Sequence, residues 1–233
     1  MIRFTDLSHH NAPLDLSRIA GKVQGVALKA TEGVGFVDGE CDKWFQQARQ
    51  LGLKRAFYHF NGIADAVSEA DYFIANTHNY FGEAIPVLDW EEIRTGSKTF
   101  LQPVSWVNTF VRRVHEVMGV WPWIYANPWK FNQGGVEPNC MRWLAQYPAV
   151  TSPTFEQAEG WDCPSADGVV GAWQFCSDGR LEGYYPLDLD LFYGSEGAWD
   201  AYAKGEGQQV EPEPGKTYVL EGDGIKVSVE VEG

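Results

Sequence analysis

The sequence predicts an α/β protein whose parallel strands close into a (β/α) barrel. Short apolar segments rich in β-branched residues alternate with longer amphipathic segments, which is typical of repeated βα units. The predicted strands are almost continuously apolar, as expected for a parallel sheet that helices cover. An open, doubly wound sheet fits the same alternation, but no G-x-G-x-x-G motif follows the first strand, which favours the barrel.

The first half of the chain carries the clearest alternation. Strands are predicted at residues 2–5, 23–30, 54–60, 84–90 and 121–126. Helices are predicted at residues 41–51, 68–80 and 101–118. Gly52 and Gly119 stand where the C-terminus of a helix favours glycine, which supports two of these boundaries.

Predicted helices become rare after about residue 130. Segments 142–146 and 171–175 have the composition of strands and are joined by loops rich in Pro and Ser. We therefore expect an irregular second half of the barrel, ending near residues 199–202, and one catalytic domain over residues 1–204.

The last 29 residues differ from the barrel in composition. Residues 205–215 combine Gly, Glu, Gln and Pro, which predicts an extended acidic linker. Strand-like runs at 217–221 and 225–231 flank Gly222-Asp223-Gly224, so residues 216–233 are expected to form a β-hairpin tail. Because an isolated hairpin is marginally stable in water, the tail should dock on the barrel, on a second copy or on a partner module; a disordered chain end is the alternative.

Charge and composition exclude several classes of function. The formal net charge is −14, and a surface of this sign does not favour nucleic acid as a partner. No apolar stretch is long enough for a membrane span, and residues 1–6 lack the features of a signal peptide. The 10 Trp, 10 Tyr and 13 Phe exceed the needs of a core of this size, which indicates a carbohydrate cleft, although core packing alone is the alternative.

Neither the cysteines nor the histidines have the spacing of a metal site. Cys41, Cys140, Cys163 and Cys176 form no C-x-x-C pair and are expected to be buried thiols, with a bridge between Cys163 and Cys176 left open. His9-His10 has no ligand partner at a recognised spacing, so it is expected to shape its loop through hydrogen bonds. No metal and no cofactor are expected.

A pair of carboxylates ends the apolar strand at residues 84–90. Asp89 and Glu91 are two residues apart and therefore share one face of the strand, which points into the mouth of a parallel barrel. Carboxylates this close raise the pKa of one of them, and the protonated group can then act as the acid in glycosidic cleavage. A D-x-E triplet alone is weak, but polar residues also end other strands: Asp6, Glu32, His59 and Tyr125.

Several motifs together resemble, in order, those of the glycoside hydrolase family 25 lysozymes over residues 4–194. They are Asp6-Leu7-Ser8-His9-His10-Asn11, Leu28-Lys29-Ala30-Thr31-Glu32-Gly33, Tyr58-His59-Phe60, Val87-Leu88-Asp89-Trp90-Glu91, Trp123-Ile124-Tyr125-Ala126, Ala172-Trp173-Gln174-Phe175 and Asp188-Leu189-Asp190. The resemblance implies a modified (β/α) TIM-like barrel. It also implies a muramidase that acts on bacterial peptidoglycan glycan strands, cleaving the β-1,4 bond between N-acetylmuramic acid and N-acetylglucosamine.

The resemblance also implies roles for residues. Glu91 matches the family's proton donor and Asp89 its partner carboxylate, while Asp6 and Asp188 match two further acidic residues. The expected substrate-binding residues are Tyr58, Tyr125, Trp173, Glu32, His59 and Gln174. Trp90 departs from the small or aliphatic residue usual between the two carboxylates, and its side chain is expected to face away from the cleft.

The sequence leaves mechanism and biological role open. Attack by the substrate's own N-acetyl group, by a protein nucleophile or by water with inversion all remain; a carboxyl separation of ~5 to 5.5 Å fits a nucleophile and ~6.5 to 9.5 Å fits inversion. A wall-binding module without catalysis and a hydrolase of chitin-like polymers are rival functions. The missing signal peptide predicts a phage endolysin, held in the host cytoplasm before release to the cell wall; a secreted enzyme with a trimmed signal is the alternative.

Overall fold

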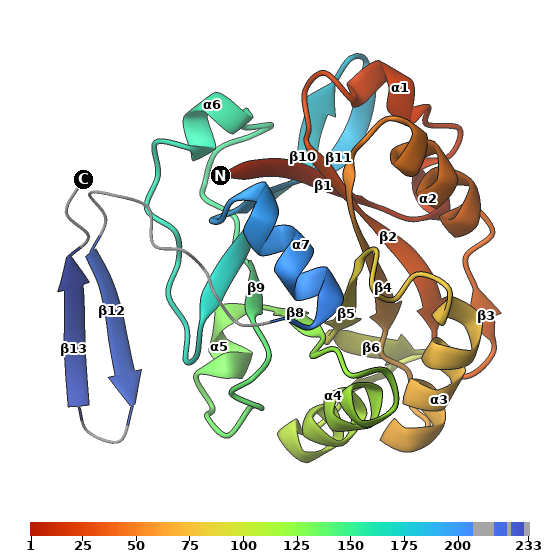
Figure 1. Cartoon of the computed structure of the whole chain (residues 1–233), viewed down its shortest axis with the longest axis vertical. Coiled ribbons are helices and arrows are strands. Elements are labelled where there is room, and N and C mark those ends of the chain that lie inside the picture. The colour runs from red at the N-terminus through yellow and green to blue at the C-terminus, as the bar shows by residue number, and fades with distance from the viewer. Residues whose placement is uncertain (207–216, 223–224, 231–233) are drawn as a thin grey trace.

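Eight strands form a closed barrel in the computed structural model, which describes residues 1–206, 217–222 and 225–230 (Figure 1). Around the barrel the order is β1 (Ile2–Leu7), β2 (Gly25–Glu32), β4 (Lys54–Phe60), β5 (Ile85–Asp89), β8 (Trp123–Ala126), β9 (Arg142–Ala145), β10 (Val170–Leu181) and β11 (Tyr184–Phe192). The predicted α/β barrel is confirmed. A short strand, β3 (Phe36–Val37), pairs with the end of β2 outside the closed ring.

The barrel closes through one antiparallel strand. The first seven strands pair in parallel, whereas β11 runs antiparallel to both β10 and β1. Only Glu182 and Gly183 separate β10 from β11, and both have positive φ, 49° and 90°. A two-residue turn of this kind returns the chain beside the strand it has just left, so no crossover helix is formed.

Three long helices cover the outside of the first half, as predicted. They are α2 (Cys41–Gln50), α3 (Ala66–Thr77) and α4 (Val104–Met118). Gly119 caps α4 in the left-handed conformation that favours glycine, at φ 73°. The predicted helix at 101–118 starts three residues late because the chain before it forms a hairpin, β6 (Glu92–Thr95) and β7 (Lys98–Leu101), which the sequence did not reveal.

The second half is irregular, as predicted, and a buried arginine organises it. Only two four-residue helices, α5 (Pro128–Phe131) and α6 (Phe155–Ala158), lie between β8 and β10. The Arg142 guanidinium is 1% exposed and donates to the carbonyl oxygens of Val136, Glu137, Cys140 and Asp167. One side chain thus satisfies backbone groups that would be bonded within a helix elsewhere.

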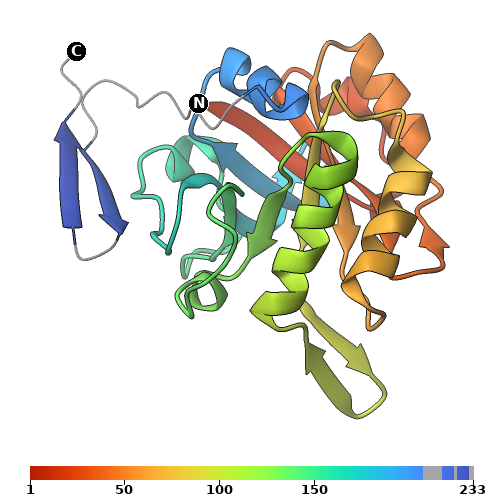
Figure 2. The ribbon, with the colours of Figure 1, turned by 60° about the horizontal axis from the view of Figure 1, so that its bottom comes forward.

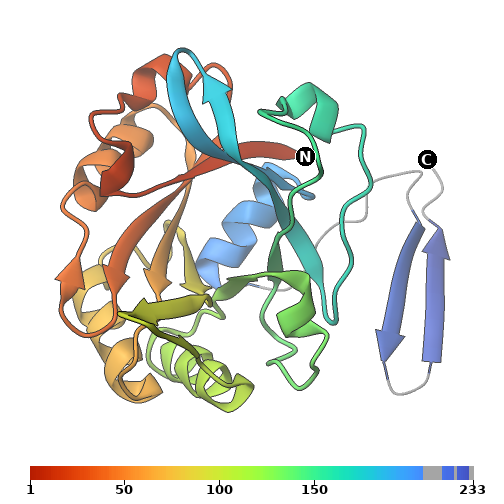
Figure 3. The ribbon, with the colours of Figure 1, turned by 180° about the vertical axis from the view of Figure 1, so that it is seen from behind.

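A final helix closes the base of the barrel. In α7 (Glu196–Lys204), Trp199 packs its ring against Phe4, Trp123 and Phe192 from three strands. Its indole Nε1 donates to the Arg55 carbonyl at the start of β4. Figure 3 shows α7 across one end of the barrel, and Figure 2 shows the β6–β7 hairpin projecting from the other end. The open end of the barrel is therefore the end where the parallel strands finish.

Two short helical segments near the N-terminus and the tail hairpin complete the described elements. A helical turn, η1 (His9–Asn11), follows β1, and α1 (Leu16–Ile19) precedes β2. The predicted tail hairpin is present as β12 (Thr217–Gly222) and β13 (Ile225–Glu230), which pair antiparallel. The predicted linker begins where α7 ends, and most of it lies outside the described residues.

The cysteines and the lengths of the helices bear on two further sequence predictions. None of the four cysteines forms a disulfide; Cys41, Cys140 and Cys176 are buried and Cys163 is half-buried. Within the described ranges, no helix has both the length and the apolar character needed to cross a membrane.

Candidate functional site

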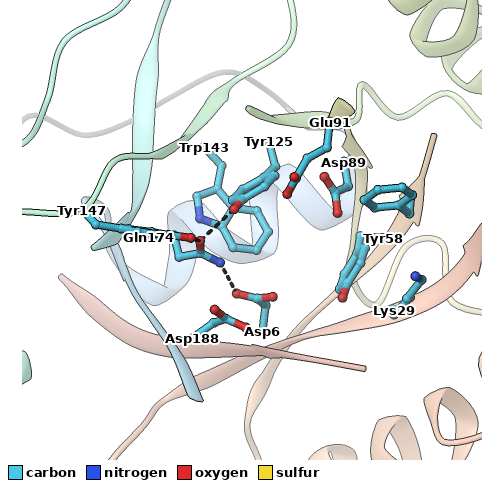
Figure 4. A pocket seen from close by; sticks show the side chains of 11 residues that line it. Asp6, Lys29, Tyr58, Asp89, Glu91, Tyr125, Trp143, Tyr147, Gln174 and Asp188 are labelled. Atoms are coloured by element: carbon cyan, nitrogen blue, oxygen red, sulfur yellow. Dashed lines mark hydrogen bonds between the residues drawn. The ribbon is translucent and has the colours of Figure 1, made fainter. Parts of the chain in front are cut away.

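A pocket of about 250 Å³ opens at the C-terminal end of the parallel strands (Figure 4). Every strand of the closed barrel, or the residue that directly follows it, contributes to its wall. The lining residues are Asp6, Lys29, Tyr58, Phe60, Asp89, Glu91, Tyr125, Trp143, Tyr147, Gln174 and Asp188. A polar floor with aromatic walls suits a ligand that has both hydroxyl groups and apolar faces.

Strand alternation explains how the acidic pair reaches this pocket. On β5, Ile85 and Val87 pack inside the barrel, whereas Leu88 and Trp90 pack in the layer between strands and helices. Asp89 and Glu91 continue the inward series and line the pocket. Trp90 faces outward as predicted, is 1% exposed and donates its indole Nε1 to the Gln102 carbonyl at 2.8 Å.

The two carboxyl groups of the pair have different surroundings. Asp89 is 9% exposed, and burial, followed by the charges of Glu91 and Asp6, raises its pKa well above the usual value. Glu91 is half-buried, and burial likewise raises its pKa, while the Lys130 ammonium opposes the rise. Both groups therefore retain protons at a higher pH than exposed carboxyls do.

Two lysines supply positive charge beside the pair. Lys29 lines the pocket and donates to Glu32 Oε2 at 2.6 Å, and its Nζ lies 4.9 Å from the centre of the Phe60 ring. Lys130 is 4% exposed and donates to the Trp90 carbonyl at 2.7 Å, so α5 holds it directly behind the Asp89–Glu91 segment. Burial lowers the pKa of Lys130, and the nearby carboxylates oppose that shift.

A buried glutamine connects the opposite wall. Gln174 Oε1 accepts hydrogen bonds from the Tyr125 hydroxyl at 2.7 Å and from the Tyr147 hydroxyl (Figure 4). Its Nε2 then donates to Asp6 Oδ2 at 2.7 Å. Because two hydroxyl donors fix the position of the amide oxygen, the amide nitrogen must face Asp6, and it supplies that carboxyl with a donor.

The two remaining acids share this wall. Burial raises the pKa of Asp6 to about 6, and the Gln174 hydrogen bond partly opposes that rise. Burial, followed by the charges of Asp6 and Glu91, raises the pKa of Asp188 to about 8. Since at least one of these groups is protonated near neutral pH, the pocket can hold both a proton donor and a negative charge.

The loop after β4 holds the backbone of Glu91. Asn61 is fully buried, and its Oδ1 accepts from the Glu91 amide at 2.6 Å. Beneath it, the buried carboxylate of Glu69 accepts from the amides of Gly62 and Ala64, at 2.6 and 2.8 Å, and contacts His59 Nε2 at 3.0 Å. His59 Nδ1 bonds the Thr31 hydroxyl at 2.8 Å, so this imidazole supports the loop from behind.

Most of the predicted site residues meet in the pocket, but three do not line it. Asp6, Asp89, Glu91, Asp188, Tyr58, Tyr125 and Gln174 line its wall. His59 and Trp173 lie on outward-facing strand positions; the Trp173 indole donates to the Gln146 carbonyl at 2.7 Å, behind the barrel wall. Glu32 is bonded to Lys29 at the rim.

The sequence missed Lys29, Phe60, Trp143 and Tyr147 in the wall. The signal was available for three of them, because Lys29, Phe60 and Trp143 each lie two residues from another inward-facing position on the same strand, whereas Tyr147 lies beyond the end of β9. The predicted loop-shaping role fits His9, whose Nδ1 bonds Asp38 Oδ2 at 2.8 Å and joins the loops after β1 and β3. No group of three or more potential ligands that could hold a metal ion occurs in the part of the chain that the structure describes.

Known proteins share both the sequence pattern and the fold. The family model described as "Glycosyl hydrolases family 25" matches residues 5–184. An autolytic lysozyme from Clostridium acetobutylicum is 26% identical over 75% of this chain and 50% of its own length, and lysozyme M1 from Streptomyces globisporus is 26% identical over 82% and 67%. The chain thus spans half of the first relative and about two thirds of the second.

The crystal structure of a bacterial lysozyme from Streptomyces coelicolor has the same fold. It superposes with a TM-score of 0.72 at 23% identity, covering 87% of this chain and 97% of that one.

Proposed function

Because this chain belongs to glycosyl hydrolase family 25, we propose that it is a muramidase that hydrolyses the β-1,4 bond between N-acetylmuramic acid and N-acetylglucosamine in bacterial peptidoglycan. The observation that carries the proposal is the Asp89–Glu91 pair, which the barrel presents at its mouth with two further acids. Hydrolysis of a glycosidic bond needs an acid for the leaving oxygen and negative charge for the developing oxocarbenium ion.

Glu91 is the proposed proton donor. Its half-buried carboxyl has a pKa that burial raises, so it keeps its proton to a higher pH than an exposed glutamate does and can deliver that proton to the glycosidic oxygen. The Asn61 hydrogen bond to its backbone fixes the point from which the side chain reaches into the pocket. Activity should therefore fall as pH rises through the pKa of Glu91.

Asp89 is the proposed partner carboxylate, and Asp6 and Asp188 set the field around the reacting sugar. A negative Asp89 can stabilise the developing charge at the anomeric carbon, orient a substrate acetamido group or attack directly. Tyr58, Phe60, Tyr125 and Trp143 supply aromatic wall on which the apolar faces of sugars can stack.

We also propose that the protein is a phage-type endolysin. Such a protein accumulates in the host cytoplasm and reaches the wall only after the membrane opens. Expression in the cytoplasm of a susceptible host should leave cells intact until a membrane permeabiliser is added, and then lyse them within minutes. If cells that express only this gene lyse without the permeabiliser, the result would instead favour an exported wall enzyme.

The tail hairpin is proposed to mediate association with a second copy or a partner module. Light scattering gives the number of copies per particle. If copies associate through the tail, deleting residues 205–233 should lower that number, and an unchanged number of copies excludes self-association through the tail.

Purified walls give the test of the muramidase proposal. The native protein should reduce turbidity and release fragments with a muramic acid reducing end, detected by mass spectrometry. Glu91→Gln, which keeps the shape but lacks the transferable proton, should lower the rate by at least about 100-fold. Glu116→Gln, on the exposed surface of α4, is the matched control and should keep native activity.

Each rival function predicts a different outcome. If native protein binds walls but cuts none, the barrel is a recognition module. If it cuts chitin oligomers and leaves walls intact, it is a hydrolase of another polymer.

A further inference from the structure

Asp190 is a buried carboxyl group immediately below the pocket floor. It lies on β11, opposite Phe4 of β1 and Gln174 of β10, and is 0% exposed. It does not line the pocket, so it cannot touch the substrate directly. Burial of a carboxyl at this depth needs hydrogen bonds to compensate for lost water.

One oxygen of Asp190 has a clear partner. Its Oδ1 accepts a hydrogen bond from the Trp143 indole Nε1 at 3.0 Å, and the Trp143 ring forms part of the pocket wall. The indole nitrogen can only donate, so this bond fixes the plane of the ring. Asp190 thereby sets one of the surfaces on which a sugar would rest.

The other oxygen, Oδ2, is buried and accepts no hydrogen bond from the described part of the chain. The neighbouring acids are Asp6 from β1 and Asp188 from β11 itself, and their negative charges, after burial, raise the pKa of Asp190 well above its usual value. An ionised Asp190 would leave one buried oxygen bare among negative groups, which is strongly unfavourable.

A proton on Oδ2 resolves this conflict, because the hydroxyl can donate to Asp6. A hydrogen bond from Asp190 lowers the pKa of Asp6, whereas the same bond raises the pKa of Asp190. Asp6 would then be held by two donors, the Gln174 amide and the Asp190 hydroxyl. Two donors favour the ionised form of Asp6 and fix its direction.

We propose that Asp190 is a neutral positioning acid, whose hydroxyl donates a hydrogen bond to the Asp6 carboxylate while its other oxygen holds the Trp143 ring. It therefore presents an ionised Asp6 and a fixed aromatic surface to the reacting sugar. The role rests on the proposed muramidase function, because it matters only if chemistry takes place in this pocket.

Two substitutions separate a neutral donor from an ionised group. In Asp190→Asn, the amide oxygen can accept from Trp143 and the amide nitrogen can donate to Asp6, so activity should stay within about threefold of native and the pH profile should not move. Asp190→Leu keeps the number and branching of the side-chain heavy atoms but has no polar atoms, and it should lower kcat at least about tenfold.

The pH profile gives a readout that a loss of packing would not produce. In Asp190→Leu, Asp6 loses a donor to its ionised form, its pKa rises, and the acidic limb of the profile should move to higher pH. If Asp190→Asn is as inactive as Asp190→Leu while both stay folded by circular dichroism, the negative charge is required and the proposal is wrong. Full activity and an unmoved profile in Asp190→Leu would also overturn it.

Carbon-13 NMR of the aspartate carboxyls tests the protonation without reference to activity. The Asp190 signal, assigned by its loss in Asp190→Asn, should keep the shift of a protonated acid between pH 4 and pH 7. A titration near pH 4 would contradict the proposal. If the native protein cuts no wall, the muramidase proposal fails, and this measurement still decides whether Asp190 is neutral.

Discussion

Burial raises the pKa of acidic side chains in the pocket, and this shift links function to stability at the scale of single residues. The pKa of Asp6 is raised to about 6 and that of Asp188 to about 8, both first by burial. A raised pKa means that the folded state binds the proton more tightly than the unfolded chain. The resulting stability is complete below the unfolded pKa near 4 and is lost as pH rises through about 6 and then about 8.

Replacing Asp188 by Asn should stabilise the protein at alkaline pH. The amide removes an ionisation that the pocket resists, so at pH 9 we expect a gain of at least about 1.4 kcal/mol in the free energy of unfolding, the equivalent of one pKa unit. Urea unfolding from pH 6.5 to 9 is the measurement. Wall hydrolysis should fall in the same variant.

The urea series starts at pH 6.5 so that the titration of His59 does not contribute to it. Burial lowers the pKa of His59, which makes stability fall as pH drops below about 6.5. Asp162→Asn, at an exposed position, is the control and should follow the native curve. Equal slopes for Asp188→Asn and native protein would show that Asp188 ionises without cost in the fold.

Residue by residue, the site could be predicted where strand alternation was applied and not where it was neglected. Alternation placed Asp89 and Glu91 correctly and turned Trp90 away. The same rule applied to β10 assigns inward positions to Ala172 and Gln174 and excludes Trp173 from the pocket wall. Motif resemblance alone does not distinguish a residue that lines a pocket from one that packs behind it.

At the scale of elements, the loop between β4 and α3 is held by one buried carboxylate. Glu69 accepts from two loop amides and contacts His59, while the loop's Asn61 holds the Glu91 backbone. Glu69→Ala leaves two half-buried amides without acceptors and the buried His59 without its carboxylate partner, so we expect a loss of about 3 kcal/mol in the free energy of unfolding.

The same variant should affect catalysis beyond its effect on stability. At a temperature where Glu69→Ala is still folded, its kcat should be reduced because Glu91 is no longer fixed through Asn61. Thermal melts and wall hydrolysis at 15 °C are the measurements, with the exposed Glu116→Ala on α4 as control. A destabilised variant with native kcat would separate the loop from the chemistry.

The strand β11 and the β6–β7 hairpin could not be predicted from hydrophobic periodicity, for different reasons. The strand β11 has leucines at 187, 189 and 191 outside the barrel and acids at 188 and 190 inside, the reverse of a strand with an apolar interior face. The β6–β7 hairpin is mostly exposed on both faces, so it carries no alternation at all. Only tertiary structure reveals how the barrel closes and where the hairpin projects.

At the scale of the whole molecule, net charge should affect how the protein approaches the proposed wall substrate. The chain has a formal charge of −14, and anionic wall polymers should repel it at low ionic strength. Raising salt from about 10 mM to about 150 mM shortens the screening length from roughly 30 Å to roughly 8 Å and should increase the initial rate on walls severalfold.

A neutral soluble glycan fragment provides the comparison. Its hydrolysis should change little over the same salt range, because no long-range repulsion opposes its binding. A wall rate that falls with salt would show instead that local cationic contacts dominate binding.

The helix α7 closes the barrel at the end remote from the pocket, and the chain leaves the barrel there, after Lys204. Anything joined to that point, such as a bead, a label or a surface anchor, is held at the pole opposite the mouth. A form immobilised directly after Lys204 would therefore face outward and leave the mouth of the pocket unobstructed. Attachment through the β6–β7 hairpin would put the support beside the mouth and block it.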